Sequence, residues 1–396
     1  MPPSESLRVR VLLTALVALG PISTDLYLPA LPTLVTVFGT DIASVQLTLS
    51  VFLVGFAVSQ LVYGPLSDRF GRRPALLGGV LVYLLGSLGC MMATSIGGLI
   101  AARLVQAVGA CCGPVVARAV VRDVFGRDRA ASVLAYMAMA MTLAPAAGPV
   151  LGGVMTELFG WRANFALLAG FAALTLAGLW TMLGETNAAR DPQALKPGRL
   201  AANYARLMRD RAFVGHAMMV GFTYSGIFAF ISGSSFVLIE RLKLSPSAYG
   251  LSFGTAVLGY MTGSFFAGRL SQRLGAARMI RIGTSISLAG GLAGALLAVA
   301  DATHLAAVLA PFFVFLFGAA FTLPNGMAAA IGPYPAMTGL ASALLGFWQM
   351  GTGAVAGTLI GHIHTGTQLP MMGGIGLLSV LAAGAYRLVA APARKA

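Results

Sequence analysis

The stretch YGPLSDRFGRR starts at residue 63, and a similar stretch, AGRLSQRLGAA, starts 204 residues later at residue 267. The two copies share five residues in the same spacing: Gly64/Gly268, Leu66/Leu270, Ser67/Ser271, Arg69/Arg273 and Gly71/Gly275. Each copy follows an apolar run, and the offset brings the runs 45–66 and 249–269 into register. Parallel repeats of this kind are an architecture of membrane transporters. The chain is therefore predicted to be a duplicated unit of six helices.

The composition also points to a membrane protein. Of the 396 residues, 58% are hydrophobic and 10% are charged, whereas soluble domains have roughly 45–50% apolar and about 25% charged residues. A transmembrane helix needs about 20 mostly apolar residues. Such runs occur at residues 10–31, 45–66, 75–95, 98–119, 131–155, 163–184, 213–238, 249–269, 279–299, 304–325, 337–360 and 369–390. The predicted fold is all-α and transmembrane, with twelve helices in two pseudo-symmetric six-helix bundles.

A polar stretch near the middle of the chain separates the two predicted bundles. Residues 185–212 contain Pro, Gly and many charges. They are predicted to form a cytoplasmic linker between an N-terminal bundle, 1–184, and a C-terminal bundle, 213–396. Two interpretations stay open for the end of the linker, residues 200–211: a basic amphipathic helix that lies on anionic lipid, or a solvated connection.

The charge distribution predicts the orientation. The net charge is +14, from 26 Lys and Arg against 12 Asp and Glu. The basic residues form short clusters between apolar runs, which argues against nucleic-acid binding and follows the positive-inside rule. With alternating spans, almost all clusters fall on one side, which is predicted to be cytoplasmic and to hold both termini. The first run follows Arg8 and Arg10 and is predicted to be a retained helix rather than a cleaved signal peptide.

The three cysteines, Cys90, Cys111 and Cys112, lie in apolar segments without metal-ligand spacing to histidine. They are predicted to be small buried hydrophobes. No metal site is predicted.

An acidic residue lies within the first span, in GPISTDLYLPALP, residues 20–32. Asp25 is the acid that falls well inside a predicted span, and Arg103 is the clear basic counterpart, in the fourth span. Each costs roughly 2.5–3.5 kcal/mol to insert at the membrane centre, so such residues generally face a cavity or one another. Asp25 is predicted to be a reversible proton site, biased by Arg103, which can also bond to Gln106 one turn along. The alternative is a structural ion pair that only ties two helices together.

The loop between the second and third spans, GPLSDRFGRRP, contains an acid among arginines. Its glycines allow a tight turn, and Pro74 suits the first turn of the next helix. Asp68 has two open roles: a pair with Arg72, or a place at a facing helix N-terminus, where the macrodipole favours an anion.

The fifth span contains APAAGPVLGG, residues 144–153. Small residues at Gly148, Gly152 and Gly153 allow close approach of a neighbouring helix, and Pro149 kinks the helix. Two interpretations of this segment stay equally open: a packing seam between helices, or a hinge.

On these residues, the whole chain resembles a major facilitator superfamily transporter, specifically a drug:proton antiporter of the bicyclomycin/chloramphenicol-resistance (Bcr/CflA) type. STDLYLPALP resembles that branch's first-helix signature, in which the aspartate serves proton and drug coupling. The resemblance implies a coupling role for Asp25, Arg103 and Gln106. It implies a cytoplasmic gate made of Gly64, Asp68, Arg69, Gly71, Arg72, Arg73 and Asp123. The fifth-span motif resembles the one characteristic of antiporters, made of Gly148, Pro149, Gly152 and Gly153.

Two positions depart from the family pattern. The second copy of the loop has Gln272 where the first has Asp68, so the strong gate is expected in the first half alone. Some multidrug relatives have a second first-helix acid two turns before the aspartate, where this chain has Val17. That substitution argues against efficient export of dications.

The substrate pocket is predicted from helical spacing and side-chain type. In a continuous first helix, Ile22 and Leu28 or Pro29 share the face of Asp25, and Tyr27 points elsewhere. Flexible methionine and aromatic surfaces suit promiscuous binding. The candidate lining residues are Ile22, Met137, Met141, Tyr224, Phe228, Phe253, Tyr260, Trp348 and Gln349. For each of them, a place in the core or against lipid is the competing interpretation.

The sequence thus predicts a monomeric multidrug exporter of a bacterial cytoplasmic membrane, with no nucleic-acid partner. It would export small, moderately apolar drugs, such as amphenicol- or bicyclomycin-like antibiotics, in exchange for protons by alternating access. The proton gradient is the expected energy source, without a cofactor. The alternatives are a proton-coupled exporter of an endogenous sugar or amino acid on the same fold, a channel, or a membrane-embedded enzyme. No nucleophile–base pair or metal cluster in the sequence favours the enzyme.

Overall fold

The computed structural model describes residues 7–187, 190, 192, 194, 196–363 and 365–390, and among these residues every regular element is a helix. Within the helices, the side chains of 126–132, 135–136, 138–144, 197, 199 and 336 are not described. The helices of the N-half are α1 Leu7–Asp25, α2 Leu31–Phe38, α3 Ile42–Phe70, α4 Arg72–Met92, α5 Ile96–Ala110, α6 Cys112–Phe159 and α7 Arg162–Met182. After α8 Pro197–Arg209, those of the C-half are α9 Arg211–Ser235, α10 Pro246–Leu274, α11 Ala276–Val299, α12 Leu305–Ile331, α13 Thr338–His362 and α14 Leu369–Gly384.

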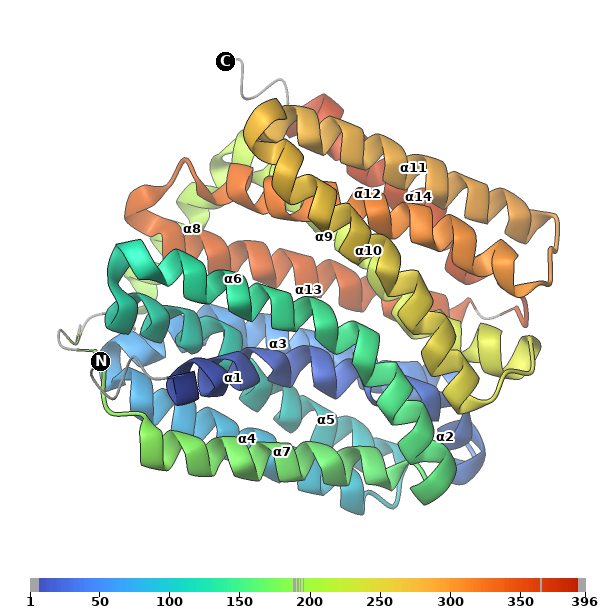
Figure 1. Cartoon of the computed structure of the whole chain (residues 1–396), viewed down its shortest axis with the longest axis horizontal. Helices are drawn as coiled ribbons and strands as arrows, with labels where there is room; N and C mark the ends of the chain where they lie inside the picture. Colours follow the sequence, from blue (N-terminus) through green and yellow to red (C-terminus); the bar gives the residue numbers. More distant parts are fainter. Residues whose placement is uncertain are drawn as a thin grey trace.

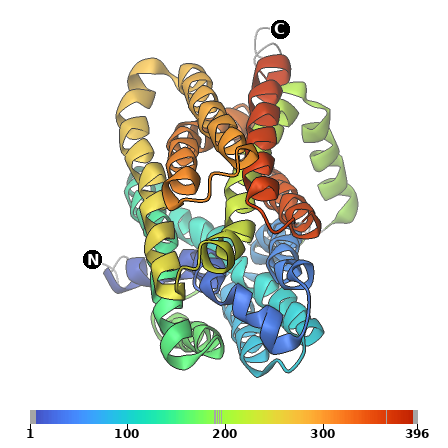
Figure 2. The same ribbon diagram turned by 90° about the vertical axis from the view of Figure 1, so that its right-hand side faces the viewer.

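The two halves lie side by side, with the N-half in the lower part of Figure 1 and the C-half in the upper part. We call the left end of that view, which carries α8 and the α3–α4 turn, the linker end. The right end, which carries α2 and the α9–α10 connection, is the distal end. Figure 2 looks onto the distal end and shows the same division between the halves.

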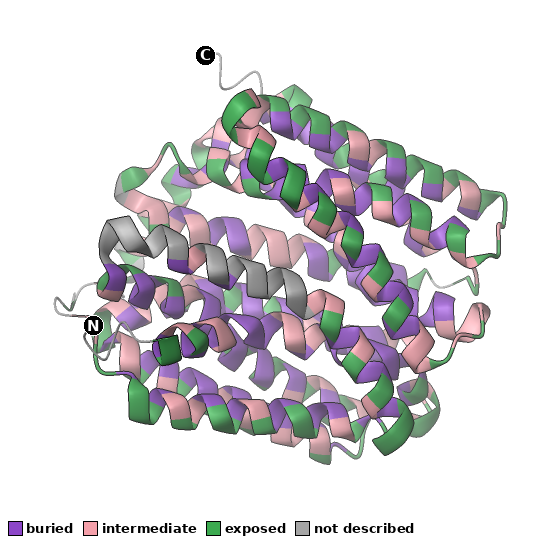
Figure 3. Ribbon diagram, in the orientation of Figure 1, coloured by how far each residue is buried: buried purple, intermediate pink, exposed green. Residues whose placement is uncertain are grey.

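Ten stretches of the described residues are long and apolar enough to cross a membrane. The two other predicted spans, 131–155 and 249–269, fall within α6 and α10. Exposed residues alternate with buried ones along the outer helices, such as α7 and α11 (Figure 3). On these helices the exposed side chains include large apolar ones, for example Leu174 at 76% and Leu296 at 70% exposure. An apolar outer surface of this kind suits contact with lipid, so the chain is a multi-pass membrane protein.

The internal repeat is visible in the backbone. Helices α3 and α10 each have 29 residues, and both end at a glycine with positive φ, 109° at Gly71 and 73° at Gly275. Each begins at a side-chain cap: Asp41 accepts from the N–H of Ser44, and Ser245 accepts from that of Ala248. Glycine adopts positive φ without steric penalty, so the helix–glycine–helix corner is encoded at the same place in both halves. The two corners agree with the predicted duplication.

Helix α6 contacts α1 at two places that lie far apart along α6. A Cβ on Gly113 would lie 1.9 Å from the carbonyl oxygen of Leu16, and one on Gly152 would lie 1.9 Å from that of Leu26. At about 1.5 Å per residue, Leu16 and Leu26 are roughly 15 Å apart, whereas Gly113 and Gly152 would be roughly 60 Å apart in a straight helix. The helical backbone of α6 therefore doubles back, and its two arms correspond to the end of the fourth predicted span and the fifth.

The described hydrophobic cores show which end of the molecule is closed. At the distal end one core combines both halves and includes Leu28 and Leu34 of the N-half with Phe230 and Tyr249 of the C-half. Toward the linker end, buried residues form one core within the N-half and another within the C-half and α8. The halves are thus sealed together at the distal end, as burial of shared apolar surface favours.

Helix α8 packs its apolar side on the protein. Leu207 is fully buried in the C-half core, and the hydroxyl of Tyr204 donates to the carbonyl oxygen of Leu61 in α3, at 3.4 Å. Residues 200–209 are thus helical, as the first of the two interpretations expected, while the contact of this helix with anionic lipid stays a prediction.

Candidate functional site

The first membrane segment is broken at Asp25, which corrects the prediction of a continuous helix over 10–31. Helix α1 ends at Asp25, a 3-10 turn covers Leu28–Ala30, and α2 begins at Leu31. Proline explains the break: Pro29 has no N–H for the carbonyl oxygen of Asp25, and its ring would clash with that carbonyl in an α-helix. The faces inferred from uniform helical spacing do not hold beyond Asp25. Tyr27 is fully buried, and its hydroxyl lies 3.0 Å from that of Thr48.

The carboxyl group of Asp25 is buried without a partner in the described part of the chain. The residue is 4% exposed. The described residues give it no hydrogen bond or ion pair. An unpaired carboxylate in an apolar site is costly, so the neutral, protonated form is favoured there.

The glycines of α6 allow this helix to pack directly against Asp25 and Leu26. A Cβ on Gly148 would lie 2.9 Å from the Cβ of Asp25, and one on Gly152 would lie 1.9 Å from the carbonyl oxygen of Leu26. On the other side of α6, a Cβ on Gly153 would lie 2.4 Å from the carbonyl oxygen of Pro246 in α10. The motif therefore forms a packing seam in which α6 is held between α1 and the C-half.

Arg103 is fully buried beside Ser23 and does not pair with Asp25, which corrects the expected contact. Its Nη1 donates to the carbonyl oxygen of Ser23 at 3.0 Å and to Oε1 of Gln106 at 2.6 Å. The Ser23 carbonyl can accept because the N–H of Tyr27 bonds to Thr24 instead, at 3.3 Å. The proline-induced break thus frees the acceptor that Arg103 uses.

Aromatic rings surround the rest of the guanidinium group. The ring centroids of Phe52, Tyr27 and Phe165 lie 4.4, 5.0 and 6.0 Å from the Cζ of Arg103. Cation–π attraction stabilises a desolvated guanidinium in this position. Nε and Nη2 of Arg103 have no hydrogen-bond acceptor among the described residues. Two strong donors therefore remain available beside the break in the first membrane segment.

A ring of buried hydrogen bonds ties Arg103 to three helices. Nε2 of Gln106 donates to the hydroxyl of Ser87 at 2.8 Å, and that hydroxyl donates to the carbonyl oxygen of Tyr83 at 2.8 Å. The hydroxyl of Tyr83 lies 2.6 Å from that of Ser23, which closes the ring. Networks of this kind rigidify a core, so the end of α1 is tied to α4 and α5.

The predicted pocket residues divide by exposure. Met137, Phe228 and Phe253 are buried, at 2%, 1% and 3% exposure. Ile22, Tyr224 and Tyr260 are half-buried and pack on the core that the two halves share. The half-buried residues are thus better placed for a substrate next to Asp25 in this conformation.

The remaining candidates lie farther along the C-half. Nε1 of Trp348 lies 3.3 Å from the sulfur of Met208 on α8, toward the linker end. Gln349 is half-buried. The side chain of Met141 lies outside the described residues. Met350 packs on both the shared core and the N-half core. It was not predicted, because nothing local in the sequence distinguishes it from the other methionines.

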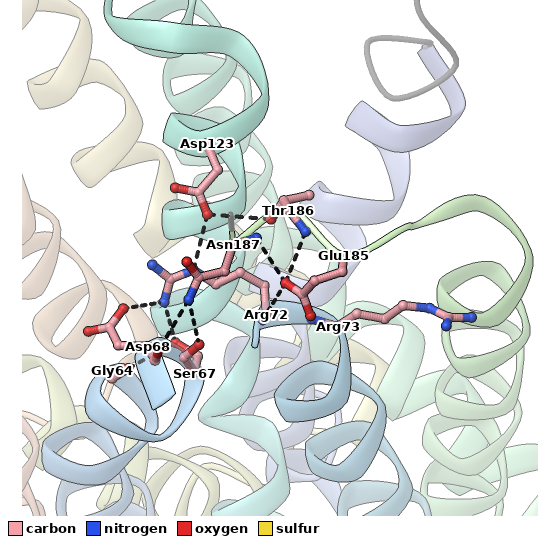
Figure 4. Close-up of polar contacts among 9 residues, drawn as sticks. All are labelled: Gly64, Ser67, Asp68, Arg72, Arg73, Asp123, Glu185, Thr186 and Asn187. Carbon is pink, nitrogen blue, oxygen red and sulfur yellow. Dashed lines mark hydrogen bonds and ion pairs between the residues drawn. The ribbon is translucent and has the colours of Figure 1, made fainter. Parts of the chain in front are cut away.

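At the linker end, Arg72 is the centre of the gate motif (Figure 4). Its Nη1 lies 2.5 Å from Oδ1 of Asp68 and 2.6 Å from the hydroxyl of Ser67. Its Nε lies 3.1 Å from Oδ2 of Asp123 on α6. Of the two roles open for Asp68, the pair with Arg72 is the one seen. The guanidinium group thereby joins α3, α4 and α6 at one corner, as charge-assisted hydrogen bonds favour.

The other gate residues lie around this corner. The carbonyl oxygen of Gly64 accepts from the Ser67 hydroxyl at 2.9 Å (Figure 4). Arg69 stacks on the ring of Phe70, with 5.2 Å between Cζ and centroid. Nη2 of Arg73 donates to the carbonyl oxygen of Trp180 at 3.0 Å. These contacts hold the turn against the end of α7.

Glu185, at the start of the linker, also binds the gate residues and was not predicted from the sequence. Its carboxylate accepts from the backbone N–H groups of Arg72 and Arg73, at 2.9 and 3.3 Å, and so caps α4. A Cβ on Gly71 would lie 2.3 Å from Oε2 of Glu185 and would displace this carboxylate, while the positive φ of 109° favours glycine independently. Partial burial acts to raise the pKa of Glu185, but backbone hydrogen bonds from Asn187, Arg72, Arg73 and Thr186 outweigh it and lower the pKa.

Replacement of Glu185 by Gln is expected to lower the unfolding temperature of the purified protein. Loss of a helix cap costs about 0.5–1 kcal/mol at a solvent-exposed position. Because the folded pKa lies below the ordinary value of 4.5, the stabilisation is full above pH 4.5 and is lost as the pH falls through the folded pKa. Thermal unfolding across this range should show a weaker pH dependence in Glu185→Gln than in the wild type. Equal pH dependence would contradict the capping role.

The sequence and the fold of the chain are similar to those of known proteins. A sequence model described as Major Facilitator Superfamily matches residues 13–358. The chain is 29% identical to the "Bicyclomycin resistance protein homolog" of Haemophilus influenzae, with 92% of each chain covered. It is 31% identical to the "Chloramphenicol resistance protein" of Pseudomonas aeruginosa, with 80% of this chain and 75% of the other covered. Among solved structures, an inward-facing, unoccupied bacterial homolog of the human lysosomal transporter Spinster superposes with a TM-score of 0.78 at 17% identity, covering 99% and 98%.

Proposed function

The chain belongs to the Major Facilitator Superfamily, in its Bcr/CflA type of drug exporters, and we propose that it exports small, moderately apolar drugs in exchange for protons bound at Asp25. The observation that carries the proposal is the burial of Asp25 without a partner among the described residues, at 4% exposure, where α6 is pressed against α1. Relatives are named for resistance to bicyclomycin and chloramphenicol. Amphenicol- or bicyclomycin-like compounds are therefore the first substrates to test.

Proton binding and release would follow from the surroundings of Asp25. In the conformation closed at the distal end, the unpaired carboxyl group is favoured in its protonated form. A drug that occupies the space beside Tyr224 would compete with this state, and water that reaches Asp25 would allow its ionisation. Arg103 would act on Asp25 through the end of α1, because its Nη1 holds the carbonyl oxygen of Ser23, two residues before Asp25.

Coupling requires that drug and proton prefer different conformations of the halves. The packing seam of α6 gives this coupling a physical basis, because α6 contacts Asp25 on one side and the first turn of α10 on the other. A change of charge or volume at Asp25 would therefore act on the contact between the halves. Rocking of the halves around this seam would give alternating access.

The orientation and the boundaries are part of the proposal. We place the linker end in the cytoplasm, with both termini, because the arginine clusters lie there. The membrane is the bacterial inner membrane, and the protein acts as a monomer. The bundles are 1–184 and 213–396, joined by the linker 185–212.

The proposed function is tested with a drug-susceptibility panel in bacterial cells that lack their own exporters. Cells that express the protein should tolerate at least fourfold higher concentrations of several unrelated compounds, chloramphenicol among them, than cells with an empty vector. Protein in the membrane is quantified in parallel. Unchanged tolerance to every compound, with protein present, would favour the export of an endogenous metabolite instead.

A further inference from the structure

The C-half contains a basic pocket that has no counterpart charge among the described residues. A pocket of about 530 Å3 lies on the last turns of α10 and is lined by Phe266, Gly268, Arg269, Leu270, Gln272 and Arg273. Both arginines are exposed. Arg278 and Arg281, on the first two turns of α11, are exposed as well. The α10–α11 turn lies at the linker end of the upper half in Figure 1.

The sequence supplies no acid for this pocket from its own half. Residues 213–396 contain two acids, Glu240 and Asp301. Both belong to the distal end, where Asp301 pairs with Arg241 at 2.5 Å. Among the described residues, Arg269 and Arg273 have no ion pair. Positive charge therefore accumulates at this corner without a partner among the residues that the structure describes.

Comparison of the two repeats shows that the C-half corner lacks the carboxylates of the N-half corner. In the N-half, Asp68 and Asp123 bind Arg72, and Glu185 fills the space beside Gly71, with Oε2 only 2.3 Å from a Cβ built there. In the C-half, Gln272 replaces the acid at the position of Asp68. Among the described residues, nothing lies within 4 Å of a Cβ on Gly275. The second corner thus keeps the turn and one arginine of the first, Arg273 at the position of Arg69, and it has a further arginine, Arg269, but it lacks the carboxylates.

The surroundings of the pocket identify the kind of anion that fits. Phe265 and Phe266 are 54% and 46% exposed beside it, and the guanidinium of Arg269 lies 3.8 Å above the ring of Phe265. Arginines at the end of a membrane helix, next to exposed aromatic rings, match a molecule with an anionic head and an apolar tail. Basic pockets of this kind on the cytoplasmic side of membrane proteins suit phospholipid head groups.

We propose that the pocket of Arg269 and Arg273 binds the phosphate of an anionic phospholipid, which supplies the negative charge that this corner lacks among the described residues. The lipid bridges the arginines of α10 and lays its acyl chains along Phe265 and Phe266. Its binding steadies the α10–α11 corner, just as Glu185 steadies the α3–α4 corner.

The probe is dioctanoyl phosphatidylglycerol, added to the purified protein in detergent, with dioctanoyl phosphatidylcholine as the lipid without net charge. A ligand that binds the folded state raises the unfolding temperature, so thermal shift and native mass spectrometry give an apparent affinity. Phosphatidylglycerol should stabilise the wild type, and phosphatidylcholine should not. Glycerol 3-phosphate at the same concentration should also have no effect, because it lacks the apolar tail.

Two variants at this corner test the site. Arg269→Gln/Arg273→Gln should weaken phosphatidylglycerol binding roughly thirtyfold. Gln272→Asp, which restores the acid of the first copy, should also weaken it, while both variants unfold cooperatively without lipid. The matched control is Arg206→Gln/Arg209→Gln on α8, which removes the same charge.

Three results would overturn the proposal. Unchanged affinity in both pocket variants would show that the lipid does not bind there. An equal loss in the α8 control would show that binding reflects general charge at the linker end. Equal stabilisation by glycerol 3-phosphate would show a site for free anions. None of these results depends on drug transport, so they leave the proposed function untouched.

Discussion

Cells that express Asp25→Asn should lose the drug tolerance given by the wild type, down to the level of an empty vector. Asparagine has nearly the shape of a protonated aspartic acid but cannot release a proton, so the exchange cycle would stop while the fold is retained. The removal of a buried carboxyl group that has no partner among the described residues should leave the unfolding temperature unchanged or raise it. The measurements are the susceptibility panel and thermal unfolding of the purified variant.

Asp41→Asn is the matched control for this prediction. Asp41 is also an acid of the N-half, but it is exposed and caps α3 by accepting from the N–H of Ser44. Asparagine is also a good helix cap, so the control should keep the full tolerance. Full tolerance in Asp25→Asn, at equal protein level, would exclude Asp25 as the proton site.

Gly152→Ala should abolish transport and lower stability, although it adds only one methyl group. The new Cβ would lie 1.9 Å from the carbonyl oxygen of Leu26, and a backbone atom cannot rotate away as a side chain can. Helix α6 must therefore separate from α1 next to Asp25, which costs about 1–3 kcal/mol as an overpacked contact. Drug efflux from cells and thermal unfolding of the purified protein measure the two effects.

Gly78→Ala in α4 is the matched control, because no described atom lies within 4 Å of the place that its new Cβ would take. Alanine favours a helix by up to about 1 kcal/mol over glycine, so this variant should be as stable as the wild type or more so. If Gly152→Ala behaves like Gly78→Ala, the close contact of α6 with α1 is not needed for transport.

The fold was largely predictable because its signals are local and repeated. The pattern around Gly71 and Gly275 predicted both corners, and the apolar runs predicted the membrane segments. The break at Asp25 was not predicted, although Pro29 stands in the sequence. Membrane helices often tolerate proline, so the residue alone does not tell whether a helix will kink or end.

The candidate site was predictable in its residues but not in all of its contacts. Asp68 and Arg72 are four residues apart on one corner, so their ion pair followed from spacing. Arg103 bonds instead to the Ser23 carbonyl, which is freed only by the broken helix. Glu185 reaches Arg72 from 113 residues away, and no periodicity in the sequence reports such a contact.

The most direct test of the central claim is drug-induced proton release from the purified protein. Protein in detergent, in weakly buffered solution near neutral pH, is mixed with chloramphenicol or another compound identified by the panel, and the pH change is recorded. If drug and proton compete at Asp25, the wild type releases protons on drug binding and Asp25→Asn releases none. Equal release by Asp25→Asn, or drug binding to the wild type without any proton release, would contradict the account.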